Sequence, residues 1–112
     1  MLKGYLFYDD ETANSAQLIC SLAYILCDNE GNQIAEPVNQ LINPECKIAP
    51  THQRIHHISN SDVVGMPTMS QFCENSDFIK HLSEYVLVAH NAKGADLHHI
   101  RKSLEACGKD VP

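Results

Sequence analysis

Residues 18–27 form a run of ten residues that is almost wholly apolar, and this run constrains the fold of the chain most strongly. Its length and its lack of alternation are typical of a strand buried on both faces or nearly so, which places it centrally in a sheet. A dense turn signal follows at 28–32. We expect residues 33–43 to form the partner strand, with an interruption at Pro37, because proline cannot donate to a ladder of hydrogen bonds.

The start and stop signals in the rest of the chain indicate two helices and two more strands. Thr68 and Gln71 have the spacing of a capping box, and Gly108 is a typical helix stop. The expected elements are strands at 5–8, 18–27, 33–43 and 85–89, a helical turn near 51–57, a helix after 68 broken near 75–76, and a helix at 96–107. The strand at 85–89 is uniformly apolar, as in a buried parallel strand. This order predicts an α/β fold in a single domain over residues 1–112.

Composition and charge exclude several classes of protein. The hydrophobic fraction of 44% and the charged fraction of 20% are ordinary for a soluble globular domain. No apolar run is long enough to span a membrane, and the first residues lack the pattern of a signal peptide. Five cysteines without a Cys-x-x-Cys pair favour free thiols in a reducing cytoplasm. A net charge of −6 argues against binding a polyanion through basic patches alone.

An acidic cluster follows the first predicted strand. Side chains alternate along a strand, so Asp9 and Glu11 share one face and Asp10 points to the opposite one. Two like charges side by side repel unless a cation lies between them, and carboxylate oxygens suit Mg²⁺ or Mn²⁺. The alternative is a strand that simply ends in a polar turn.

A second acidic residue, Asp96, follows the end of the strand at 85–89. Ligand-binding groups in α/β sheets gather outside such strand ends. The alternative is that Asp96 only caps its helix, although one carboxylate can serve both purposes. The adjacent histidine pairs at 56–57 and 98–99 lack the partner spacing of a zinc site.

Four segments together resemble the DnaQ-like (DEDD) 3'-5' exonucleases, and they follow in the family's order across almost the whole chain. The run Tyr8-Asp9-Asp10-Glu11-Thr12 is similar to the first motif, Asp-x-Glu-Thr. The other three segments are 41–44, which resembles a third-strand ending, 48–62, which resembles the proline loop and His-Gly-Ile-Thr segment, and 86–96, which resembles the second motif.

The resemblance implies an RNase H-like mixed sheet, with three antiparallel strands leading into a parallel one and helices beside them. It places Asp9, Glu11 and Asp96 as catalytic carboxylates that bind two divalent ions, Mg²⁺ or Mn²⁺. Thr12, His90 and Asn91 fall where the family's motif residues face the substrate. The implied reaction is two-metal hydrolysis of a phosphodiester at a single-stranded DNA or RNA 3' end.

The pattern departs from the family in three places. The segment before Asp96 is one residue longer and lacks the usual aromatic, and His57 replaces a glycine. The third motif of the DEDDh type, a general-base histidine and a last aspartate, is absent from these 112 residues. We therefore expect a C-terminally incomplete domain, completed by a further segment or by a second chain. The alternative is an inactive RNase H-like module that binds metal or nucleic acid without cleaving it.

Overall fold

A four-stranded mixed sheet organises the fold in the computed structural model, which describes residues 2–89 and 96–109 but not the side chains at 96 and 97. The strand order is β3-β2-β1-β4. The strands are β1 (Tyr5–Thr12), β2 (Ile19–Cys27), β3 (Val38–Leu41) and β4 (Val86–Ala89). The first three pair antiparallel, and β4 runs parallel to β1. The predicted mixed sheet is thus confirmed.

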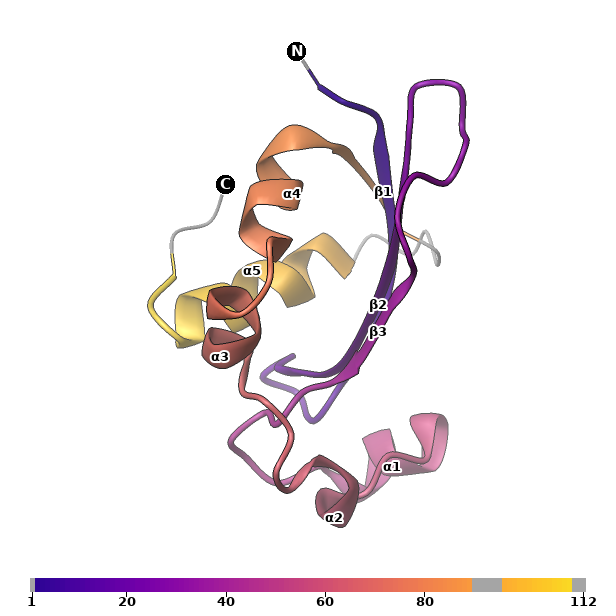
Figure 1. Ribbon diagram of the computed structural model, residues 1–112. Helices are drawn as coiled ribbons and strands as arrows, with labels where there is room; N and C mark the ends of the chain where they lie inside the picture. The colour runs from indigo at the N-terminus through magenta and orange to yellow at the C-terminus, as the bar shows by residue number, and fades with distance from the viewer. Residues whose placement is uncertain (1, 90–95, 110–112) are drawn as a thin grey trace.

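Three helices cover one face of this sheet, as Figure 1 shows with the sheet nearly edge-on. They are α3 (Met69–Glu74), α4 (Phe78–Glu84) and α5 (Asp96–Ala106). Two further helices, α1 (Pro50–His56) and α2 (Asn60–Val63), lie at the end of the sheet where β1 finishes. Within the described ranges no helix has the length and apolarity needed to cross a membrane.

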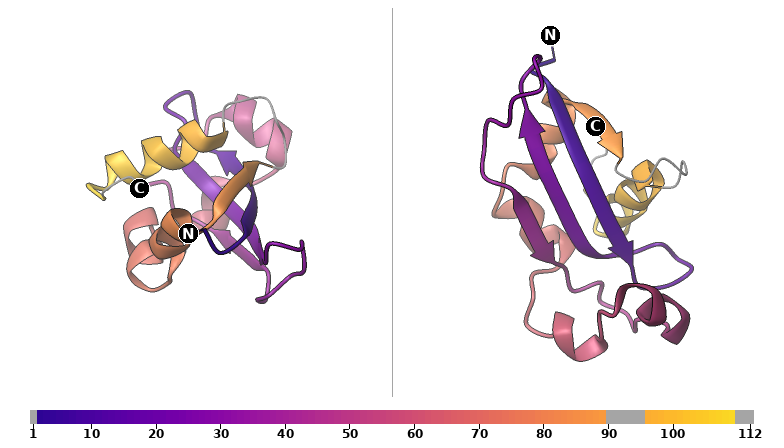
Figure 2. Two further views of the ribbon diagram at one scale, coloured as in Figure 1. Left: turned by 90° about the horizontal axis from the view of Figure 1, so that it is seen from above. Right: turned by 90° about the vertical axis from the view of Figure 1, so that its right-hand side faces the viewer.

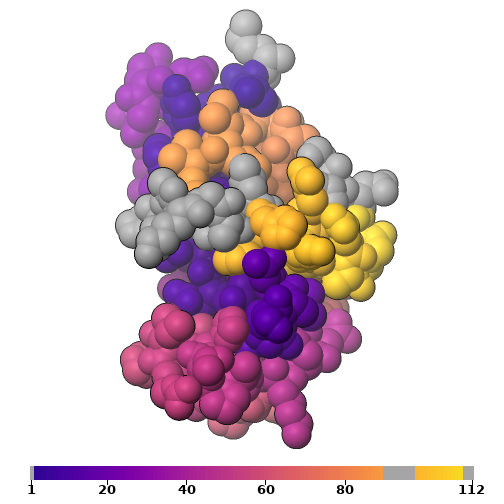
Figure 3. Space-filling view, turned by 180° about the vertical axis from the view of Figure 1, so that it is seen from behind, coloured from indigo at the N-terminus to yellow at the C-terminus, as the bar shows by residue number. Residues whose placement is uncertain are grey.

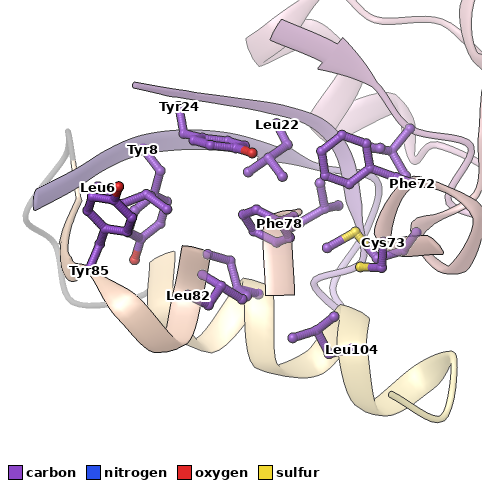
Figure 4. Close-up of a cluster of buried hydrophobic side chains, with 14 of the residues drawn as sticks. Leu6, Tyr8, Leu22, Tyr24, Phe72, Cys73, Phe78, Leu82, Tyr85 and Leu104 are labelled. Atoms are coloured by element: carbon purple, nitrogen blue, oxygen red, sulfur yellow. The ribbon is translucent and has the colours of Figure 1, made fainter. Parts of the chain in front are cut away.

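The core fills the space between the sheet and these three helices (Figure 4). Phe78 from α4 is fully buried, and its ring centroid lies 5.3 Å from that of Tyr24 and 5.5 Å from that of Phe72. Leu22 of β2 and Leu104 of α5 are also fully buried. Close packing of this kind fixes the position of α5 against β1 and β2.

The predicted helix start and helix break are both confirmed. Thr68 Oγ1 accepts from the Gln71 backbone N–H at 3.2 Å, and Gln71 Oε1 accepts from the Thr68 N–H at 3.0 Å. Ser76 Oγ donates to the Phe72 carbonyl at 2.6 Å, which satisfies a carbonyl near the end of α3. The chain then restarts as α4 at Phe78.

The opposite face of the sheet is open in the described part of the chain, and the right-hand view of Figure 2 looks onto it. Along β1, Leu6, Tyr8 and Asp10 point to the helices, whereas Tyr5, Phe7 and Asp9 are exposed. The expectation that residues 18–27 form a central strand, buried on both faces or nearly so, is confirmed, because β2 lies between β1 and β3 and its side chains are all buried or half-buried. The strand at 85–89 is parallel as expected, but the expectation that it is buried is wrong. The apolar side chains on the open face of β2 remain partly accessible, and β4 is an edge strand whose Val86 is exposed.

The third strand is shorter than the sequence suggests. The sequence predicts a partner strand over residues 33–43 with an interruption at Pro37. The interruption is confirmed, but continuous pairing covers only Val38–Leu41, directly after Pro37. The preceding turn is held by Asp28, whose Oδ1 accepts from the backbone N–H groups of Glu30 and Asn32 at 3.0 and 2.9 Å.

Candidate metal and nucleic-acid site

The acidic cluster lies within β1 rather than after it, because the strand continues to Thr12. Asp9 and Glu11 face the open side of the sheet, as the alternation predicts. Their partners across the ladder are Ala23 and Ser21 on β2. These small partners leave space above the two carboxylates, because residues directly opposite each other on a sheet face are close neighbours.

The end of β1 is irregular. The pairing with β2 shifts register between Glu11 and Thr12. Such bulges bend a strand and re-aim its side chains, and they are frequent next to active sites. Ala13, directly after the shift, is fully buried, and its carbonyl accepts from the Ala49 N–H at 2.7 Å. The segment before α1 is thus hydrogen-bonded to the chain at the end of β1.

The parallel strand β4 brings the second motif to the same edge of the sheet. Tyr8 pairs with Ala89, so β4 ends directly beside the start of the acidic cluster, four residues before the end of β1 at Thr12. His90 and Asn91, which the sequence assigned to the substrate, fall outside the described residues. Asp96 is the first residue of α5, and its side chain is also outside the described part. The structure therefore places two of the three predicted ligands and the backbone of the third.

Thr12 is fixed through its backbone by a histidine of α1. His56 Nε2 donates to the Thr12 carbonyl at 2.9 Å, and His56 Nδ1 accepts from the Ile58 N–H at 3.0 Å. These partners assign the neutral Nε2–H tautomer, because an Nδ1 that accepts a hydrogen bond carries no proton. His57 adopts the left-handed conformation, with φ 62°, so it keeps the backbone that glycine adopts easily.

Asp10 points away from the open face, as predicted, and it makes a buried contact on the helix-covered face. Its side chain is fully buried, and His99 Nδ1 of α5 donates to its Oδ1 at 2.7 Å. Sequence reasoning missed this pair and the role of His56. Both join residues far apart in the chain, 89 and 44 positions respectively. The only local signal for the Asp10 pair was an acidic residue on the face that the apolar residues of β1 assign to the core.

A buried thiol lies behind the acidic strand end. Burial raises the pKa of Cys20 to about 12, and the nearby Glu11 carboxylate adds to this effect. The thiol therefore stays protonated near neutral pH and is a poor nucleophile. Its sulfur lies 3.8 Å from His56 Nε2. All five cysteines are free, and three of them are buried.

The carboxylates on the open face fit a hard divalent cation in donor type. Both are oxygen donors on one side of a strand, with small neighbours across the ladder. Among the side chains that the structure describes, no group of three or more histidines, cysteines or acids could hold a metal ion. The predicted set of three includes Asp96, whose side chain is outside that search.

Comparison with known proteins decides the family. A sequence profile described as "Exonuclease", of the RNase T type, matches residues 6–112. The chain belongs to this exonuclease family. The resemblance to DnaQ-like exonucleases is thereby confirmed.

One curated relative of this exonuclease domain is DNA polymerase III subunit epsilon of Treponema pallidum. The two are 32% identical over 110 residues, which cover 95% of this chain and 48% of the relative. The chain thus spans about half the length of that relative. A solved structure of exonuclease X in complex with 5' overhanging duplex DNA is 27% identical, with a TM-score of 0.58 over 79% of this chain and 49% of that one.

Escherichia coli exonuclease I, solved with a dT13 oligonucleotide, shares the fold. It superposes with a TM-score of 0.79 over 95% of this exonuclease chain and 24% of that protein, at 20% identity. The RNase H-like architecture expected from the sequence is confirmed by this match. In Figure 3, which views the molecule from behind, indigo residues from the N-terminal part of the chain lie between the pink residues around α1 and the yellow residues of α5.

Proposed function

We propose that this exonuclease domain hydrolyses phosphodiester bonds at nucleic-acid 3' ends, in the 3'-5' direction. The observation that carries the proposal is the position of Asp9 and Glu11 on the open face, at the carboxyl end of β1. The parallel strand β4 ends beside them and leads to Asp96. Catalytic groups of α/β sheets gather at such strand ends.

Two divalent ions, Mg²⁺ or Mn²⁺, are the proposed cofactors, held by Asp9, Glu11 and Asp96. Bound ions of this kind lower the pKa of a water molecule and offset charge on the leaving oxygen. The chain itself contributes hard oxygen donors and a fixed strand end. The hydrogen bond from His56 to the Thr12 carbonyl holds the backbone next to Glu11. That rigidity favours a metal site, because ligands set by a sheet need little reorganisation on binding.

The proposed substrate is a single-stranded DNA or RNA 3' end, with Thr12, His90 and Asn91 facing it. Exonuclease X and exonuclease I were each solved with DNA, and this supports a nucleic-acid substrate for the present chain. The net charge of −6 leaves little general attraction for a polyanion. We therefore expect binding to depend strongly on the divalent ion.

We further propose that polypeptide outside these 112 residues supplies the general-base histidine and the last aspartate. The open face of the sheet supports this proposal, because Tyr5 and Phe7 are each 37% exposed and Val86 is 39% exposed. A groove of about 310 Å³ beside Asp9 is lined largely by apolar residues of β1, β2 and β3. Exposed apolar surface next to an edge strand is where a further chain segment packs favourably.

The test is degradation of end-labelled single-stranded DNA and RNA oligonucleotides with Mn²⁺, by the 112-residue chain alone and by the domain together with the polypeptide that supplies the histidine and the last aspartate. We expect the completed domain to release mononucleotides from the 3' end, and we expect Asp9→Asn to abolish this release. The matched control is Asp77→Asn, which removes an exposed carboxylate at the start of α4 on the helical side. Oligonucleotide binding without hydrolysis would instead support the inactive RNase H-like module.

A further inference from the structure

Asp10 stands between the two proposed metal ligands of β1 but points to the other face. Its side chain is fully buried beneath α5, and that of His99 is 16% exposed. A separation of 2.7 Å between His99 Nδ1 and Asp10 Oδ1 is that of a short, charge-assisted hydrogen bond. The bond therefore joins the strand that carries Asp9 and Glu11 to the first turn of the helix that begins at Asp96.

The buried pair of Asp10 and His99 costs more free energy than apolar contacts would to hold this helix. Burying a carboxylate costs free energy that an apolar residue of similar size would avoid. The apolar contacts of α5, through Ile100 and Leu104, are already present and fully or nearly buried. Apolar packing has little direction, whereas a hydrogen bond fixes distance and orientation. Geometry is thus the property that the pair adds.

We infer that Asp10 and His99 are a positioning pair, which fixes the first turn of α5 against the end of β1 and so sets Asp96 relative to Asp9 and Glu11. This inference rests on the proposed function, because it assigns the pair to that metal site. The pair acts from the helix-covered face, opposite to Asp9 and Glu11. It is therefore not placed to contact the substrate or the ions.

The first measurement is the Mn²⁺ dissociation constant of the 112-residue chain, followed by electron paramagnetic resonance of free Mn²⁺. We expect His99→Leu to weaken binding by roughly 10- to 100-fold, the usual effect of removing a group that orients metal ligands. His99→Asn is the rescue variant, because its amide N–H occupies a position near Nδ1, and we expect an affinity within about threefold of the original chain.

A matched control separates positioning from general loss of stability. Ser103 Oγ on the same helix accepts from the buried Ile19 N–H at 3.0 Å. Ser103→Ala removes this bond at a point about one turn beyond His99 on α5. We expect it to lower stability with Mn²⁺ affinity unchanged. Equal weakening of Mn²⁺ binding by His99→Leu and Ser103→Ala, or no weakening by His99→Leu, would overturn the inference.

The second measurement needs no metal, so it distinguishes failure of the pair from failure of the site. In an α-helix the N–H groups of residues 100–103 donate to the carbonyls of 96–99. We expect His99→Leu to speed hydrogen exchange at 100–103 by at least about tenfold, and His99→Asn to restore protection. Unchanged exchange overturns the positioning role. An original chain that binds no Mn²⁺ overturns the proposed metal site instead.

Discussion

The most informative single substitution is His56→Ala, because the His56 ring fixes both the end of β1 and the loop after α1. Its Nε2–H donates to the Thr12 carbonyl at 2.9 Å, and its Nδ1 accepts from the Ile58 N–H at 3.0 Å. Alanine removes both partners at once. The Thr12 carbonyl and the Ile58 N–H then lose hydrogen bonds in a partly buried region.

The expected cost follows from these two bonds. A typical hydrogen bond contributes about 0.5 to 1.5 kcal/mol, and a group left unsatisfied on burial costs about 1 to 3 kcal/mol. Because the site is only partly buried, we expect a total loss of about 2 to 3 kcal/mol in the free energy of unfolding. For a chain of this size that corresponds to a fall in Tm of roughly 8 to 12 °C.

Urea unfolding followed by circular dichroism measures the loss, with His52→Ala as the control. His52 lies on the same helix, and its ring contacts the exposed Thr51 hydroxyl at 3.3 Å. We expect a change below about 0.5 kcal/mol for that variant. A His56→Ala loss as small as the control's refutes the reasoning. So does a nitrogen-15 NMR spectrum that shows the Nδ1–H tautomer at His56.

Three further outcomes follow from the fold. His57→Gly should raise the free energy of unfolding by roughly 0.5 to 1 kcal/mol in urea titrations, because glycine adopts the left-handed conformation without strain; a loss of stability would contradict this. Leu104→Ala should lower it by roughly 3 to 5 kcal/mol, since the side chain is fully buried; a cost below about 1 kcal/mol would exclude the described core. Burial, aided by Cys107, raises the pKa of the Cys73 thiol from 9.0 to about 11 in the folded chain. As pH rises from 9 to 11 the thiol ionises in the unfolded chain before it does so in the folded one, so the free energy of unfolding should fall. Cys73→Ala should reduce the slope of that fall in urea titrations at several pH values, and an unchanged slope would refute the assignment.

The elements that the sequence predicted well depend on local signals. The capping box at Thr68 and Gln71, the break near Ser76 and the alternation of Asp9 with Asp10 are all set by neighbours in the chain. Their outcome therefore needed no knowledge of the tertiary structure.

Burial and long-range contacts were not predictable in the same way. Residues 85–89 have the composition of a buried strand, but their exposure depends on what covers the sheet and its edge. The contact between Asp10 and His99 depends on how α5 docks. The roles of Asp9, Glu11, Asp96, Thr12, His90 and Asn91 stay predictions.

The central claim is that Asp9 and Glu11, with Asp96, hold divalent metal on the open face. Paramagnetic broadening by Mn²⁺ in amide NMR spectra tests it most directly. We predict that amide signals are lost first at residues 9–12 of β1 and at residues 21–23 of β2, which pair with them. The double substitution Asp9→Asn and Glu11→Gln should prevent this broadening. Broadening centred on the turn at Asp28 or on the histidines of α1, and insensitive to that double substitution, would contradict the claim.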